Sequence, residues 1–152
     1  MATYNSDVYN AKAAAGTGHG VHKISQHLHA VAALDASITT NDVVNFGYIP
    51  PNAVVVGVTL KAQSQLDSAT SLTRDVGVTG TAALWKSAIS TVGRAAGVSS
   101  DTTIATGGGL YKNGSAKTLV IATCHAAAGT PVAGNLEIDV EYYVEDPGGS
   151  QA

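Results

Sequence analysis

The sequence predicts an all-β protein, a single-domain β-sandwich of jelly-roll or Greek-key type. Several segments alternate apolar and polar residues with a period of two, which is the pattern of half-buried strands. Turn residues separate these segments at short intervals, and no repeat or linker divides the 152 residues into a second domain. We expect one short helical insertion, an extended N-terminal arm at residues 1–18, a sandwich domain at residues 19–146 and a flexible tail at residues 147–152.

The composition is apolar but poor in charge. Apolar residues make up 45% of the chain, whereas aromatic residues make up 5% and charged residues 12%. The charged share is about half of that in average proteins. A charge-poor surface is typical of proteins that associate, so the composition predicts a homo-oligomer.

The net charge, the length of the apolar segments and the cysteine count also exclude several classes of function. A formal charge of -3 offers no basic face to a phosphate backbone, so nucleic acid is not an expected partner. No segment is apolar for long enough to cross a membrane, and the first residues lack the pattern of a signal peptide. A single cysteine, Cys124, allows no internal disulfide and leaves the Cys-rich zinc patterns without enough ligands.

Residues 1–49 predict the arm and two strands. Residues 1–18 show neither a helical stripe nor a strand alternation, so we interpret them as an arm outside the core. Residues 21–35 predict a long strand, with a helix as the competing interpretation. The strand interpretation depends on apolar residues at even positions, namely Ile24, Leu28, Ala30, Ala32 and Leu34. Residues 41–49 predict the second strand.

The motif Pro50-Pro51-Asn52 predicts a turn before the most aliphatic strand, residues 53–61. Pro50 favours extended backbone in the residue before it, Pro51 is preorganised for a turn, and Asn52 suits a later turn position. Both faces of this strand are nearly uncharged, which predicts that a second layer or another subunit covers the second face. The residues expected to share one face are Val54, Val56, Val58 and Leu60.

The middle of the chain predicts a strand, a helix and a hairpin. Residues 72–80 form the expected strand. A short helix is predicted after it, because Thr81 can cap the segment and because Trp85 and Ile89 are four positions apart. Asn113-Gly114 is a strong hairpin signal, so the segments on either side of it are expected to pair.

The last strand, residues 135–146, shows the clearest alternation. Its pattern predicts one buried face and one wet face. The wet face carries Glu137, Asp139 and Glu141 at the spacing of neighbours on a sheet, where carboxylates could serve acid–base chemistry or bind calcium. Because no apolar residues surround them on that face, we interpret them as a solvated face.

The histidines and the cysteine raise the question of a metal site or a catalytic pair. His27 and His29 would project from one face of a strand, and His19 has the same parity. No third ligand is evident, so we interpret them as surface or interface histidines, with a metal or pH-sensing site as the alternative. Cys124 and His125 are adjacent, so on a strand they point to opposite faces and cannot form a nucleophile and its base.

The order of motifs after residue 40 resembles that of small virion proteins of tailed bacteriophages. The matching segments are residues 49–60 ("IPPNAVVVGVTL"), 72–80 ("LTRDVGVTG"), 82–97 ("AALWKSAISTVGRAAG") and 134–144 ("GNLEIDVEYYV"). The resemblance implies a capsid decoration (cement) protein, a β-sandwich that forms trimers on the outer surface of the phage head. Such a protein clamps neighbouring major capsid subunits. The resemblance also implies that the protein has no enzymatic activity and no cofactor, and that it assembles in the host cytoplasm.

The arm is the predicted contact with the capsid or with another subunit. Its anchoring side chains are expected to be Tyr4, Val8 and Tyr9. A trimer that binds through three arms would bind more tightly than a single arm does.

A receptor- or glycan-binding head of a virion appendage is the alternative function, because a jelly roll suits it equally. A hydrolase that uses the acidic row is a third interpretation.

Overall fold

The computed structural model describes residues 1–5, 25–103 and 110–145. These residues form ten β-strands. The strands are β1 (Thr3–Asn5), β2 (Gln26–Leu34), β3 (Val43–Ile49), β4 (Ala53–Ala62), β5 (Thr73–Val78), β6 (Thr81–Ile89), β7 (Ser99–Thr103), β8 (Tyr111–Lys112), β9 (Thr118–Ala126) and β10 (Gly134–Val144). The described residues contain no helix that is long and apolar enough to span a membrane.

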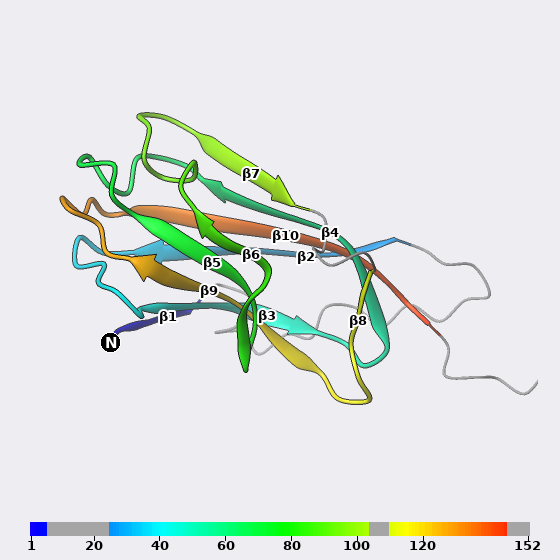
Figure 1. Ribbon diagram of the computed structural model, residues 1–152. Coiled ribbons are helices and arrows are strands. Elements are labelled where there is room, and N and C mark those ends of the chain that lie inside the picture. The colour runs from blue at the N-terminus through cyan, green and yellow to red at the C-terminus, as the bar shows by residue number, and fades with distance from the viewer. Residues whose placement is uncertain (6–24, 104–109, 146–152) are drawn as a thin grey trace, which may run out of the picture.

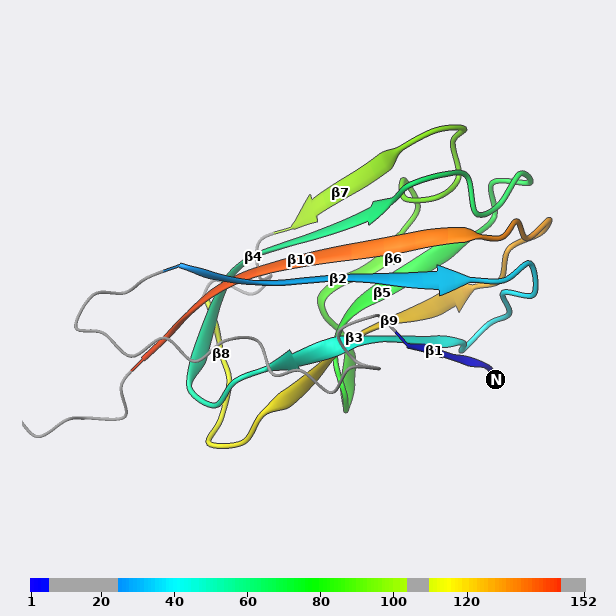
Figure 2. The same cartoon turned by 180° about the vertical axis from the view of Figure 1, so that it is seen from behind.

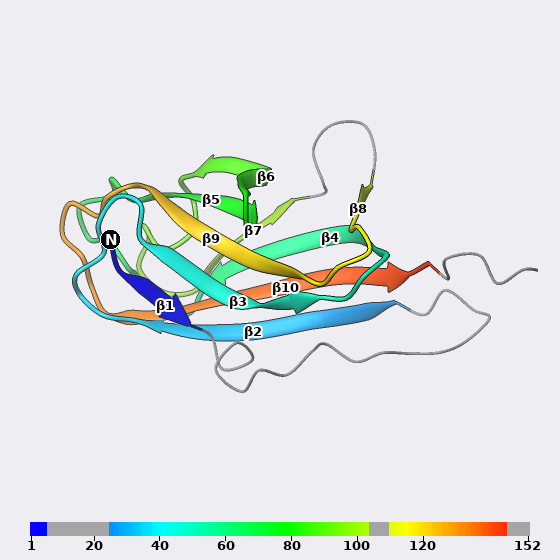
Figure 3. The same cartoon turned by 90° about the horizontal axis from the view of Figure 1, so that it is seen from below.

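The strands form two sheets that pack face to face. Sheet A has the strand order β1-β3-β9-β5-β6, and sheet B has the order β2-β10-β4-β7, with β8 also paired to β4. The pair formed by β1 and β3 is parallel, and the other pairs within the sheets are antiparallel. Figure 1 views the molecule from the side of sheet A, Figure 2 from the side of sheet B, and Figure 3 shows the layers from below.

Both sheets contribute to one hydrophobic core. The even positions predicted for β2 are buried from Leu28 to Leu34, and the predicted apolar face of β10 is buried from Leu136 to Tyr142. The two strands are paired in antiparallel register, with Leu28 opposite Val140. Burial of such side chains stabilises the fold by about 25 cal/mol per Å² of apolar surface. The period-two prediction for these two strands is therefore confirmed.

The Pro50-Pro51-Asn52 turn forms as predicted. The backbone N–H of Ala53 donates to the carbonyl of Pro50 at 3.4 Å, and Asn52 has a φ of 58°. This left-handed conformation is one that asparagine tolerates better than most residues. The strands on either side, β3 and β4, belong to different sheets. The turn therefore carries the chain from one layer to the other.

The prediction that Val54, Val56, Val58 and Leu60 share one face of β4 is wrong for the first part of the strand. Ala53 and Val55 face the core in the first part of the strand, whereas Val58 and Leu60 face it in the second part. The register with β10 shifts between Glu141 and Tyr142, so β4 contributes one extra residue at this point. Such a bulge reverses the alternation of side chains between the two faces.

The predicted helical insertion is also wrong, because residues 81–89 form β6 at the edge of sheet A (Figure 1). The chain reverses after β5 through Gly80, which has a φ of 88°. Trp85 and Ile89 are both buried, as the helix prediction required. A spacing of four residues places side chains on one face of a strand as well as on one side of a helix. That spacing therefore could not separate the two structures.

Asn113-Gly114 does not close a hairpin. β8 before it pairs with β4 in sheet B, and β9 after it lies in sheet A. The side chain of Asn113 is buried, and its amide donates to the carbonyls of Pro50 at 2.7 Å and Ala116 at 2.9 Å. Its oxygen accepts the hydroxyl of Thr118 at 2.6 Å. The asparagine thus joins two connections at one end of the sandwich.

Candidate interaction surfaces

The first residues of the predicted arm lie on sheet A. Thr3, Tyr4 and Asn5 form β1 opposite residues 43–45 of β3. The ring of Tyr4 is half-buried against the core, and its hydroxyl donates to Oδ1 of Asp35 at 2.8 Å. Burial is the main cause that raises the pKa of Tyr4. Val8 and Tyr9, the other predicted anchors, lie outside the described residues.

Asp42 holds the start of β1 in place. Its buried carboxylate accepts the backbone N–H of Ala2 at 2.5 Å through Oδ1 and that of Thr39 at 2.7 Å through Oδ2. The carbonyl of Ala2 in turn accepts the N–H of Val43 at 3.0 Å. Burial raises the pKa of Asp42, but the N–H donors lower it more, so its pKa lies below the ordinary value. These contacts attach the N-terminal segment to the edge of sheet A.

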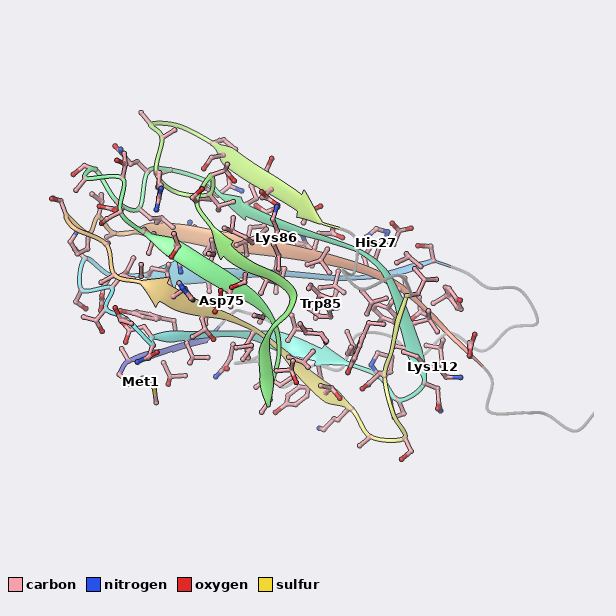
Figure 4. All side chains as sticks on the ribbon, viewed as in Figure 1. Met1, His27, Asp75, Trp85, Lys86 and Lys112 are labelled. Carbon is pink, nitrogen blue, oxygen red and sulfur yellow. The ribbon has the colours of Figure 1, made fainter. Side chains whose placement is uncertain are left out.

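The predicted acidic row and two of the histidines meet on the outer face of sheet B. We call this surface the histidine–acid face. Its members are His27 and His29 of β2 with Glu137, Asp139 and Glu141 of β10. The register places Asp139 opposite His29 and Glu141 opposite His27. Figure 4 labels His27 on β2.

Most of the charges on the histidine–acid face are paired. Nδ1 of His27 lies 2.7 Å from Oδ1 of Asp139, and the hydrogen bond to this carboxylate is the main cause that raises the pKa of His27. Glu141 accepts the hydroxyl of Ser25 at 2.6 Å, and Glu137 lies 3.6 Å from Nζ of Lys61. Within the described ranges, no three His, Cys, Asp or Glu residues are placed to hold a metal ion. His19 lies outside those ranges.

Cys124 and His125 point to opposite faces of β9, as predicted. Cys124 is buried in the core, and its thiol donates to the carbonyl of Ala126 at 3.2 Å. Burial raises the pKa of this thiol, which disfavours the reactive thiolate. His125 is exposed and lies 3.1 Å from Oδ2 of Asp75. The two side chains do not form a nucleophile and its base.

Asp67 joins two connections at one end of the sandwich, and sequence reasoning missed it. Its carboxylate is fully buried. Oδ1 accepts the backbone N–H groups of Ala69 and Thr130, both at 3.0 Å. Oδ2 accepts the N–H groups of Ser71 and Leu72, both at 2.7 Å. Burial raises the pKa of Asp67, but these donors outweigh it and hold the pKa well below the ordinary value.

A third connection is tied to the same place. The guanidinium of Arg94 donates to the carbonyls of Leu72 at 2.5 Å and Ser71 at 2.8 Å. The carbonyl of Gly93 accepts the N–H of Leu66 at 2.7 Å. The carbonyl of Leu66 then accepts the N–H of Val132 at 2.9 Å. We call these three connections, residues 63–72, 90–98 and 127–133, the loop platform.

The loop platform exposes apolar side chains and almost no charge. Val98 is 63% exposed and Val132 is 38% exposed, and the N–H of Val132 donates to the carbonyl of Leu66. Only Asp67 and Arg94 carry a formal charge among the platform residues. Asp67 is buried, and Arg94 is half-buried with its guanidinium on backbone carbonyls. The platform and Met1 lie at one end of the sandwich, and Lys112 lies at the other (Figures 1 and 4).

One signal in the sequence could have identified part of this network. Asp67 is followed by Ser68, Ala69, Thr70 and Ser71, and aspartate before small polar residues is typical of a turn in which the carboxylate binds nearby N–H groups. The contact with Thr130 has no such signal, because it depends on how the two sheets bring distant connections together.

Comparison with known proteins gives matches among solved structures of phage capsids. No family model matches the chain, and no curated protein matches it. A chain of the cyanophage Pam1 capsid asymmetric unit is 33% identical, with a TM-score of 0.72, and the match covers 89% of this chain and 96% of that one. A chain of the capsid of Ralstonia phage GP4 is 21% identical with a TM-score of 0.70, and the match covers 97% of this chain and 100% of that one.

The two matches carry different weight. The GP4 chain shares the fold at an identity too low to show more. The Pam1 chain shares a third of its residues over nearly its whole length, so the two chains are also of similar size. The protein therefore belongs to the same family as this chain of the Pam1 capsid, and it is a structural protein of a phage virion.

Proposed function

We propose that the protein is a capsid decoration, or cement, protein of a phage head. It forms a trimer on the outer surface of the head and clamps neighbouring major capsid subunits, without enzymatic activity. The observation that carries this proposal is the match to a chain of similar length within a capsid asymmetric unit. A small sandwich that accompanies a shell is suited to bracing it.

The charge-poor composition supports assembly. Charged residues make up 12% of the chain, so an interface can form with few charged groups to remove from water. A trimer can hold the shell at several points. Once the first contact has formed, each later contact is intramolecular. Linked contacts of this kind raise overall binding by about a hundredfold or more over a single contact.

We further propose that the N-terminal arm, residues 1–18, contributes a contact with the capsid or with a neighbouring subunit. Val8 and Tyr9 are its proposed anchors. Tyr4 is half-buried, and Asp42 and Asp35 hold the segment around it on sheet A. Tyr4 therefore contributes only the exposed part of its ring unless β1 is exchanged between subunits.

The proposed sandwich domain spans residues 19–146, and the tail spans residues 147–152.

The strand order supports a jelly roll as the type of sandwich. Leaving out the short strands β1 and β8, the sheets have the orders β3-β9-β5-β6 and β2-β10-β4-β7. The only hairpin within one sheet of this set joins β5 and β6. The other connections of the set carry the chain from one sheet to the other, as two interlocked Greek keys require.

Binding to heads that lack the protein tests the proposed function. Purified protein is added to such heads, and the mixture is sedimented. We expect the protein to sediment with the heads at a fixed ratio and to raise the temperature at which they release DNA. Protein that stays in the supernatant and leaves that temperature unchanged would contradict the proposal.

The arm has its own test. Replacing Val8 and Tyr9 together by Ser leaves β1 and its contacts with Asp42 and Asp35 in place. We expect this variant to fold and to bind heads more weakly, because two apolar anchors are lost. Head binding equal to that of the wild type would remove the arm from the account and leave the decoration role intact.

Glycan or receptor binding is the alternative function. Tyr48, Thr79, Lys117, Thr118 and Leu119 line a shallow depression of about 400 Å³, and Nζ of Lys117 lies 4.6 Å from the centre of the Tyr48 ring. An aromatic ring beside polar groups is the kind of site that binds sugars. Screening the purified oligomer against a glycan array separates the two functions, because a decoration protein is expected to bind no glycan on it.

A further inference from the structure

We propose that the buried guanidinium of Arg74 binds a small monovalent anion, chloride or an ion like it, in the interior of the sandwich. Arg74 belongs to β5, which lies between β9 and β6 in sheet A (Figure 1). Only 1% of its surface is exposed. The site belongs to the folded protein by itself and does not rest on the proposed role on the phage head.

The guanidinium of Arg74 has hydrogen-bond donors without acceptors. Within the described part of the chain, its Nε and Nη2 are buried and have no hydrogen-bond partner. A guanidinium carries five N–H donors and no acceptor, so its burial without acceptors costs free energy. Arg94 is the only other arginine of the chain, and its guanidinium donates to the carbonyls of Ser71 and Leu72. Arg74 has no such arrangement among the described residues.

The positive charge of Arg74 is also without a nearby carboxylate. Burial lowers its pKa to about 10, so the guanidinium is still charged at neutral pH. The ion pairs among the described residues join lysine and histidine side chains to carboxylates, and none of these pairs includes Arg74. A buried charge without a partner is strongly unfavourable. An anion supplies both a counter-charge and an acceptor, whereas a water molecule supplies only the acceptor.

Two titratable side chains lie close enough to act on Arg74, but neither is an anion at neutral pH. They are Cys124, which is opposite Arg74 on β9, and Tyr4 on β1. Burial raises the pKa of the Cys124 thiol and that of the Tyr4 hydroxyl, so both groups keep their protons. The thiol donates to the carbonyl of Ala126, and the hydroxyl donates to Asp35. The described residues therefore supply no counter-charge to the guanidinium.

The surroundings of Arg74 favour a small ion. Because 1% of the residue is exposed, a carboxylate on a sugar or on another protein does not reach the guanidinium. The strand pairing is irregular on both sides of the residue. The register with β9 shifts between Thr73 and Arg74, and the register with β6 shifts between Arg74 and Val76. Such bulges disrupt the ladder of backbone hydrogen bonds and are frequent next to active sites. A single positive charge in this place suits chloride better than a larger multivalent anion such as phosphate.

Thermal unfolding in chloride and in gluconate at equal ionic strength tests the site. Both anions are monovalent, but gluconate is too large for the interior. We expect chloride to raise the unfolding midpoint of the wild type by about 2–4 °C or more over gluconate, because a ligand that binds the folded state stabilises it. Arg74→Met should abolish this difference between the salts. Arg94→Met is the matched control, because it removes the other arginine, and it should keep the difference.

A crystal of the wild type grown in bromide tests the site without any variant. We expect an anomalous bromide peak beside Nε and Nη2 of Arg74. Density there that belongs to water, or to a carboxylate of the chain, would overturn the assignment. It would also be overturned by a wild type that unfolds at the same midpoint in both salts, by an Arg74→Met variant that keeps the difference, or by an Arg94→Met variant that loses it. In gluconate Arg74→Met should be more stable than the wild type, and chloride should narrow that gap.

Discussion

The carboxylate of Asp67 accepts the backbone N–H of Thr130 at 3.0 Å, across 63 positions of the chain. The same carboxylate accepts N–H groups of its own connection from Ser71 and Leu72. Connections between strands are usually the most mobile parts of a domain. One side chain therefore supplies order at the end of the sandwich where order would otherwise be lowest.

Replacing Asp67 by Asn should lower the free energy of unfolding by about 3 kcal/mol or more. The shape is kept, but an amide offers one acceptor oxygen where the carboxylate offers two, so N–H groups on one side lose their partner. Urea unfolding of the two proteins measures the difference. Asp35→Asn is the control, because Asp35 is exposed, and it should change stability far less. Equal stability of D67N and the wild type would contradict the role given to Asp67.

The low pKa of Asp67 fixes how this difference depends on pH. Its folded-state pKa lies below the unfolded value of about 3.9. The stabilisation is therefore fully present above the unfolded pKa and is lost as the pH falls through the folded one. The gap between wild type and D67N should stay constant from about pH 7 to pH 5 and shrink below about pH 4. A gap that shrinks near neutral pH would point to another group.

Gly77 tests the assignment of residues 81–89 to a strand. A Cβ at Gly77 would lie 2.3 Å from the carbonyl oxygen of Thr81 and 2.7 Å from that of Ala82, because β6 passes closely over this position. Gly77→Ala should therefore lower the free energy of unfolding by about 1–3 kcal/mol or more. Gly114→Ala is the control, since no atom lies within 4 Å of its Cβ position. Similar stabilities of the two variants would contradict the close passage of β6.

The pair of His27 and Asp139 predicts a weak dependence of stability on pH near neutrality. The folded-state pKa of His27 is raised, so its contribution is present below the unfolded pKa of about 6.5 and is lost as the pH rises through the folded value. Glu141 adds to the shift, and burial opposes it. Asp139→Asn should bring the pKa of His27 down in an NMR titration. An unchanged pKa in that variant would show that Asp139 does not cause the shift.

The buried guanidinium of Arg74 should lower the free energy of unfolding of the isolated protein. It lies on β5 with 1% of its surface exposed, and within the described part of the chain its Nε and Nη2 have no hydrogen-bond partner. Burial lowers its pKa to about 10. Arg74→Met should raise the free energy of unfolding by about 1–4 kcal/mol, since it removes a buried charge and keeps the volume. Lower stability would instead show that contacts within the isolated protein stabilise the guanidinium.

The elements that the sequence predicted correctly are those determined by local pattern. The alternation in β2 and β10 directly reflects one buried and one wet face, and the Pro50-Pro51-Asn52 turn follows from backbone preferences of three residues. These features need no knowledge of which strands are neighbours. The pattern of the histidine–acid face was predicted for the same reason.

The errors arose where pairing between distant segments decides the structure. Trp85 and Ile89 fit a helix and a strand equally, and the contact of β6 with β5 selects the strand. Asn113-Gly114 has the local signal of a hairpin, but pairing of β8 with β4 places its two flanks in different sheets. The loop platform depends on three connections that meet only in the folded sandwich, so periodicity gave no signal for it.

The position of the protein on the virion is the most direct test of the proposed function. An electron cryomicroscopy map of the virion would show where the sandwich lies and which end faces the shell. We expect sandwich density in trimers outside the shell, in contact with neighbouring major capsid subunits. A sandwich found inside the shell, or outside it without contact to neighbouring subunits, would contradict the proposed function.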